Sequence, residues 1–377
     1  YWKNNVYLSF LTILEIFIYY FGSPLLFYFL LISCYKLAMK KQKPIIYISI
    51  SFIFIFVTNF IYAAEFSWKF NNGLPETRNE SKELDRFADD VKNATNGGLN
   101  IKIYHGGSLG LKNNDVLRWL PTGAAEMGLV WANYLGRDAP ALNAVYIQGS
   151  VGSSDEHIKA IPVLKDIYSA ELKKWGIVPS GFMGLPILYA SIFCKGEPVN
   201  SIEKLRTKKL RVWSKDMVDT FKRLGVSAQI IGQTEMYVAL KTGVVDCAVY
   251  PALYAHTVSL HEVTNSASYL YPIAGLPYVL GASEKKWEKL PESYKNAVKS
   301  AAEELFKRST DYTDDEANEI EARRKLESQG VDWLVDFSAS DQRAFLDAAA
   351  ETWKEAANDA GGDALNNRAR ILKAIGR

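Results

Sequence analysis

An alternation of strand-like and helix-like segments constrains the fold of this 377-residue chain more than any other feature. Residues 66–71 alternate as a strand does, and apolar side chains at 84, 87, 88 and 91 then recur at the spacing of one helix face. Residues 99–104 are again strand-like, 113–120 form a short helical stretch before Pro121, and 126–131 are a third strand-like stretch. Strands that alternate with single helices predict a parallel sheet covered by helices on both faces.

The same order of segments occurs a second time further along the chain. Residues 210–213, 226–231 and 244–250 are strand-like, and the helix patterns between them follow Ser214 and Thr234, which stand where N-caps are expected. Glycines at 225 and 243 are placed to end these helices. We therefore expect an α/β protein with two lobes, each a mostly parallel sheet flanked by helices.

A long helical segment follows the second unit. Residues 291–330 have no proline or glycine between the first and last positions, so we expect one long helix that spans both lobes. The predicted division assigns residues 65–188 and about 277–310 to lobe 1. It assigns residues 189–276 and about 311–377 to lobe 2.

The first 64 residues differ in composition from the rest. Residues 39–64 have the layout of a signal peptide, with lysines after Met39, an apolar run, and Ala63 and Ala64 at the expected cleavage site. An uncleaved membrane anchor is the alternative. Residues 1–38 are either non-native sequence before a start at Met39, which we favour, or a membrane helix. We expect an exported, periplasmic protein.

Composition excludes several functional classes. The net charge is +2, with both signs mixed along the chain, so we expect no nucleic-acid partner. The four histidines show no i,i+4 pair, and we expect neither a metal site nor a cofactor. Cys194 and Cys247 are far apart in sequence, and we expect two buried thiols there rather than a disulfide.

Polar and aromatic residues follow the predicted strands at their carboxyl ends, where α/β sheets bind ligands. Arg211 lies in the strand at 210–213, and a guanidinium beside a buried strand is costly unless an anion meets it. A structural or surface-paired arginine is the alternative. The helix N-terminus that follows the second strand of this unit also favours anions. The candidate ligand-binding residues are Arg211, Trp213, Gln233, Thr234 and Tyr250 in the second unit, and Trp131 and Asn133 in the first.

Residues 200–251, from "NSIEKLRTKKLRVW" to "VVDCAVYP", resemble the extracytoplasmic solute-binding proteins of TRAP transporters, the DctP family. "GGSLG" at 106–110, "GAAEMGLV" at 123–130 and "SEKKWEKLPESYKNAV" at 283–298 extend the resemblance. It implies a two-lobe periplasmic-binding-protein fold without enzymatic activity. It also implies that Arg211 binds the carboxylate of an organic acid, which is delivered to TRAP membrane subunits.

Two departures from the family pattern affect the expected ligand and the alternatives. Ser191 stands roughly where many sugar-acid binders have a second arginine, so we expect a monocarboxylate with an apolar or aromatic body. Cys247 replaces a common glycine. The alternative functions are a secreted α/β hydrolase that uses Ser108 of "GGSLG", and a membrane-anchored ligand sensor.

Overall fold

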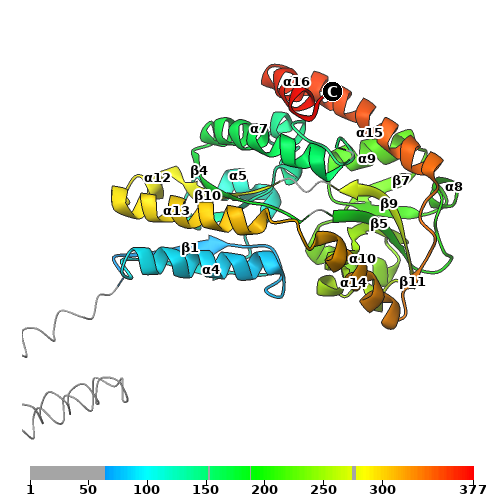
Figure 1. Ribbon diagram of the computed structural model, residues 1–377, viewed down its shortest axis with the longest axis horizontal. Helices are drawn as coiled ribbons and strands as arrows, with labels where there is room; N and C mark the ends of the chain where they lie inside the picture. Colours follow the sequence, from blue (N-terminus) through cyan, green and yellow to red (C-terminus); the bar gives the residue numbers. More distant parts are fainter. Residues whose placement is uncertain (1–63, 152, 187, 274–276) are drawn as a thin grey trace, which may run out of the picture. The chain divides into compact units, whose positions relative to one another are not determined.

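The computed structural model describes residues 64–151, 153–186, 188–273 and 277–377. Apart from Ala64, the predicted signal peptide and the apolar segment before it lie outside these residues. No helix in the described part of the chain is long and apolar enough to cross a membrane. The described residues form two sheets flanked by helices (Figure 1), and the predicted two-lobe α/β fold is confirmed.

The first sheet has the strand order β2-β1-β3-β10-β4, and the second has the order β11-β9-β5-β8-β6-β7. The strands of the first sheet are β1 (Phe66–Asn71), β2 (Leu99–Tyr104), β3 (Met127–Val130), β4 (Ile177–Met183) and β10 (Tyr278–Ser283). Those of the second are β5 (Leu188–Cys194), β6 (Lys209–Val212), β7 (Ser227–Ile230), β8 (Cys247–Pro251), β9 (Ser266–Ile273) and β11 (Asp332–Trp333).

Each sheet contains one strand that runs against its neighbours. Strand β1 pairs in parallel with β2 and β3, whereas β10 is antiparallel to β3 and β4. Strand β6 pairs in parallel with β7 and β8, and β11 with β9, whereas β5 is antiparallel to β8 and β9. The reversed strand is in each case the one that enters from the other sheet: β5 follows β4, and β10 follows β9. The remaining strands form the mostly parallel sheets that the alternating pattern predicts.

Helices cover both faces of each sheet. In the first lobe, α4 and α13 pack against each other and cover one face of the sheet. Helix α7 packs against β4 on the opposite face (Figure 1). In the second lobe, α9 and α15 pack together, and α11 and α14 pack together. The α-helices are α4 (Asn79–Ala94), α5 (Val116–Trp119), α6 (Pro140–Asn143), α7 (Ser154–Lys173), α8 (Ile202–Leu205), α9 (Lys215–Arg223), α10 (Gln233–Thr242), α11 (Ala252–Ala255), α12 (Glu284–Trp287), α13 (Glu292–Ser309), α14 (Asp315–Ser328), α15 (Ala339–Ala360) and α16 (Asp363–Ile375). Short 3-10 helices lie at Asn113–Asp115, Ala132–Tyr134, His256–Val258 and Leu260–Glu262.

The prediction of a single helix over 291–330 is wrong. Helix α13 ends at Ser309 and α14 begins at Asp315. Between them the Asp311 carboxylate accepts hydrogen bonds from the backbone N–H and the hydroxyl of Thr313. Such short polar side chains compete with the helical backbone for hydrogen bonds, which favours a turn here.

Helix α15 contributes side chains to the cores of both lobes. Its Phe345 and Ala349 belong to the core around the second sheet, whereas its Trp353 belongs to a core cluster of the first. The last helix, α16, packs on α7 and buries Ile371 and Ile375 in that same first-lobe cluster. The division of the chain into lobes remains a proposal, and we now place α16 in the first lobe.

Cys194 and Cys247 form a disulfide, so the expectation of two free thiols is wrong. The two cysteines are 53 residues apart in the chain, so their spacing alone did not predict a disulfide. The antiparallel pairing of β5 with β8 places the two residues directly opposite each other. Because this pairing depends on the strand order of the sheet, no local sequence pattern reveals it.

Candidate functional site

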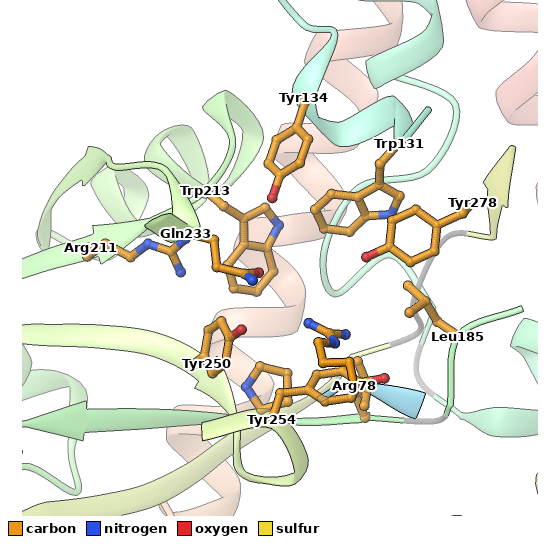
Figure 2. Close-up of a pocket in the computed structure, with 12 residues that line it drawn as sticks. Arg78, Trp131, Tyr134, Leu185, Arg211, Trp213, Gln233, Tyr250, Tyr254 and Tyr278 are labelled. Atoms are coloured by element: carbon orange, nitrogen blue, oxygen red, sulfur yellow. The ribbon is translucent and has the colours of Figure 1, made fainter. Parts of the chain in front are cut away.

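A small pocket lies between residues of the two lobes, with a cavity volume of about 50 Å³ (Figure 2). Such a volume has room for a few water molecules, so any occupant of this form of the pocket is compact. The lining residues come from strand ends, from the loops that follow them or join the lobes, and from short helices. They are Arg78, Trp131, Tyr134, Leu185, Leu188, Arg211, Trp213, Gln233, Tyr250, Pro251, Tyr254 and Tyr278.

Arg211 is the buried cation on the second-lobe side of the pocket. Its side chain is only 1% exposed. Its Nε donates a hydrogen bond to the Ile231 carbonyl at 2.9 Å, and its Nη1 donates to the Val249 carbonyl at 3.2 Å. Strand β6 lies between β7 and β8, so the guanidinium reaches the carboxyl edge that the sequence predicted.

No carboxylate of the described residues compensates the charge of Arg211. Burial lowers the pKa of its guanidinium, and the opposing influences come from the phenols Tyr134 and Tyr250. An arginine nevertheless keeps its proton at neutral pH. A buried charge whose hydrogen-bond partners are neutral carbonyls is costly, and an anionic ligand would relieve that cost.

Aromatic rings form the walls of the pocket around Trp131. The ring centroids of Tyr134, Tyr278 and Trp213 lie 4.9, 6.0 and 6.3 Å from that of Trp131. Trp131 packs against all three core clusters of the described residues, so it lies where the cores of the two lobes meet. Such apolar walls lower the local dielectric constant, which strengthens electrostatic interactions inside the pocket.

Two buried donors in the pocket have no hydrogen-bond partner among the described residues, the Tyr250 hydroxyl and the Trp213 indole N–H. Burial raises the pKa of Tyr250, and also that of Tyr134. Both phenols therefore keep their protons at neutral pH and are able to donate. In Figure 2 the hydroxyl groups of Tyr134, Tyr250 and Tyr278 point toward the middle of the pocket. Buried donors without partners are expensive, and they favour a ligand with several acceptor oxygens.

A second arginine, Arg78, enters the pocket from the first lobe, and the sequence did not predict it. It lies directly before α4 and is 4% exposed. Its Nη2 and Nε donate to Glu80 at 2.5 and 3.3 Å, and its guanidinium stacks over the Tyr254 ring, 3.5 Å from the centroid. Tyr254 of α11 also donates to Glu80 at 2.5 Å, and this bond joins the two lobes.

The pair of Arg78 and Glu80 is charged despite its burial. Burial acts to raise the pKa of Glu80, but the adjacent Arg78 and its hydrogen bonds hold that pKa below its usual value. Burial acts to lower the pKa of Arg78, but Glu80 and the nearby tyrosines hold it well above its usual value. Arg78 is therefore compensated within the protein, in contrast to Arg211.

Five of the seven predicted ligand-binding residues line the pocket, and two do not. Asn133 is buried in a 3-10 helix outside the lining, and its side-chain amide has no partner among the described residues. Thr234 is exposed and is not the cap of α10, since the N-cap is Gly232 and its N–H donates to Glu235. For the five lining residues, Arg211, Trp213, Gln233, Tyr250 and Trp131, ligand contact remains a prediction.

The lining residues that the sequence did not identify include Arg78, Tyr254 and Tyr278. The rule that pointed to Arg211 also applies to the first unit, because Arg78 follows β1 and precedes α4 at the same kind of sheet edge. Tyr254 and Tyr278 lie outside the two strand–helix units. No periodic pattern marks them, and they reach the pocket only because the lobes close on each other.

Ser108, the candidate hydrolase nucleophile, lies in an exposed glycine-rich turn. Gly107 and Gly110 adopt positive φ angles there, as a tight turn requires. The nearby His105 is not available as its base, because its Nε2 contacts Asp85 at 3.0 Å and its Nδ1 contacts Asn72 at 2.9 Å. The geometry therefore gives no support to a hydrolase.

Comparison with solved structures identifies the class of this fold. The extracytoplasmic solute receptor DctP7 of Bordetella pertussis, which binds pyroglutamic acid, matches with a TM-score of 0.72 and 21% identity over 82% of this chain and 99% of its own. The chain therefore has the two-lobe fold of extracytoplasmic solute receptors.

Sequence comparison gives the family. The profile of the bacterial extracellular solute-binding protein family 7, DctP, matches residues 70–359. A solute-binding protein of Chromohalobacter salexigens is 26% identical over 64% of this chain and 71% of its own length. The C4-dicarboxylate-binding periplasmic protein DctP of Rhodobacter capsulatus is 23% identical over 79% of this chain and 88% of its own. The chain belongs to the DctP family, and the resemblance stated from residues 200–251 is confirmed.

Proposed function

We propose that the protein is the periplasmic receptor of a TRAP transporter, and that it captures a small organic acid through Arg211. The observation that carries this proposal is the buried guanidinium of Arg211, which faces the pocket without an ion-pair partner among the described residues. The unpaired buried donors of Tyr250 and Trp213 also favour an anionic ligand that has several oxygen atoms.

The ligand carboxylate takes the position in front of Arg211. The second lobe supplies the cation and the donors of Trp213 and Tyr250, and the first lobe supplies the aromatic cover of Trp131 and Tyr278. A ligand between them contacts both lobes at once, so it binds the closed form more tightly than the open form. Binding therefore shifts the population toward closure, and the closed complex is delivered to the membrane subunits.

The relatives support this ligand class. The receptor of Bordetella pertussis binds pyroglutamic acid, and the Rhodobacter capsulatus protein binds C4-dicarboxylates. These ligands share a carboxylate on a short carbon skeleton. A compact carboxylate also suits the small cavity in this protein.

A thermal-shift screen of short organic acids, followed by titration calorimetry, tests the proposal. We expect at least one acid to raise the melting temperature and to bind at one site per chain, because a ligand of the folded state stabilises it. We also expect its methyl ester to bind poorly and the acid to be recovered unchanged. Turnover of the acid or its ester would favour an enzyme, and no stabilisation by any acid would contradict the proposal.

A further inference from the structure

The two arginines of the pocket present different net charges to a ligand. Arg78 and Arg211 are the charged residues among those that line the pocket. Glu80 lies outside the pocket lining and neutralises the charge of Arg78, whereas Arg211 has neutral carbonyl partners. The site therefore offers a ligand two guanidinium groups but only one uncompensated positive charge.

The free side of Arg78 is still a hydrogen-bond donor. Its Nε and Nη2 bond to Glu80, while its Nη1 makes no hydrogen bond to a described residue. Figure 2 shows the guanidinium directed into the space that the Tyr250 hydroxyl also faces. Burial raises the pKa of Tyr250, and both Arg78 and Arg211 oppose this effect, as two cations near one phenol would.

Arg78 and Tyr254 also separate this pocket from a second cavity. That cavity has a volume of about 480 Å³, and Arg78, Tyr254 and Glu80 all line it. Glu80 does not line the small pocket, so it acts on the ligand through Arg78. Glu80 thus reduces the positive charge that the pocket presents, although it lies outside the pocket lining.

Building on the proposed function, we infer that the pair of Arg78 and Glu80 selects acids with one carboxylate and an uncharged acceptor at the other end. The carboxylate lies against Arg211, and a carbonyl or hydroxyl oxygen accepts a hydrogen bond from Nη1 of Arg78. A second carboxylate in that place would lose its hydration and would share its cation with the negative charge of Glu80. Such uncompensated burial of charge is strongly unfavourable.

Pairs of acids that differ by one charge at nearly equal size test the inference. We would titrate malonate against malonamate, succinate against succinamate and glutarate against glutaramate. We expect the unmutated protein to bind the better monoamide at least about 10-fold more tightly than its dicarboxylate partner, because like charges brought together in an interface are disfavoured. Equal binding within each pair, or preference for the dicarboxylates, would overturn the inference.

The variant Glu80→Gln should reverse the selection. It keeps an acceptor for Tyr254 but frees the charge of Arg78, so the ratio of affinities should move toward the dicarboxylate by at least about 10-fold. The matched control is Glu83→Gln on the same helix. Glu83 pairs with Arg308 at 2.7 Å, and neither residue lines the small pocket. This control should leave the ratio unchanged.

The outcomes separate the two proposals. If no acid of the thermal-shift screen or of these pairs binds, the proposed function fails. If an acid of the screen binds but no monoamide of these pairs does, the inference alone fails. If acids bind but Glu80→Gln, shown by its melting curve to be folded, keeps the ratio of the unmutated protein, the inference alone fails. If Glu80→Gln does not fold, the ratios measured on the unmutated protein still decide between selection by charge and its absence.

Discussion

Replacing Tyr254 by Phe removes one hydroxyl group and tests whether a bond between the lobes helps to close the pocket. The hydroxyl donates to Glu80 at 2.5 Å, and Tyr254 lies on α11 in the second lobe whereas Glu80 lies on α4 in the first. Burial raises the pKa of Tyr254 well above its ordinary value, with Glu80 adding to the shift, so the hydroxyl keeps its proton at neutral pH. The stacking of Arg78 on the ring survives the change to Phe.

The expected magnitude follows from the partners of Glu80. A hydrogen bond to a charged group contributes about 1.5–3 kcal/mol. Glu80 keeps both bonds from Arg78 in the variant, so its carboxylate is not left unpaired, and the lower part of that range applies. A loss of about 1.5–2 kcal/mol from the closed form weakens ligand binding by about 10- to 30-fold when the free protein is mainly open.

Titration calorimetry with the acid that stabilises the protein most in the screen measures this effect. Tyr237→Phe is the matched control, because the Tyr237 hydroxyl donates to Glu262 at 2.8 Å within the second lobe, at the surface. We expect Tyr254→Phe to weaken binding and Tyr237→Phe to leave it unchanged. Equal affinities of both variants, or tighter binding by Tyr254→Phe, would refute the role of this bond in closure.

Two further predictions concern stability rather than binding. Replacing both Cys194 and Cys247 by Ala should lower the free energy of unfolding by up to about 4 kcal/mol, because the disulfide closes a loop of 53 residues. Ligand affinity should not change. Urea denaturation that shows no loss of stability would contradict this prediction. Burial lowers the pKa of His157 to about 4, and Tyr146 contacts its Nδ1 at 3.2 Å. Because the unfolded chain takes up this proton near pH 6.5 and the folded protein does not, stability should fall by about 3 kcal/mol as pH drops from 6.5 to 4. His157→Gln should remove that part of the pH dependence, and an unchanged slope in the variant would contradict the prediction.

The sequence predicted those parts of the fold that depend on local pattern. Strands β1, β2 and β6 and helices α4 and α9 follow from periodicity and turn residues that lie within each segment. The break between α13 and α14 was missed because the absence of Pro and Gly outweighed the weak helix preference of 310–314. The strand order was beyond local pattern, and with it the disulfide between Cys194 and Cys247.

The residues of the candidate site also fall into those that the local sequence predicts and those that it does not. Arg211 was predictable because a charged residue in an apolar strand is conspicuous, and because the carboxyl edge of a sheet is a recurring place for ligands. Tyr254 lies far from Arg78 and Glu80 in the chain, and it contacts both only where the lobes meet. Thr234 was assigned to a helix N-terminus that begins two residues earlier, at the Gly232 cap. Such offsets arise because a helix boundary depends on tertiary contacts as well as on capping preference.

The central claim is that Arg211 holds the carboxylate of the ligand, and titration calorimetry on Arg211 variants tests it most directly. Arg206→Ala is the matched control, since Arg206 also donates to a carbonyl, that of Leu224 at 2.8 Å, but is exposed. Arg211→Ala should stay folded, because it removes an uncompensated buried charge, and should weaken binding by about 2–5 kcal/mol. Arg211→Lys should also bind more weakly, since an ammonium lacks the two-pronged geometry. If Arg211→Ala binds the acid as tightly as the unmutated protein does, or fails to fold, then Arg211 is structural and the claim is wrong.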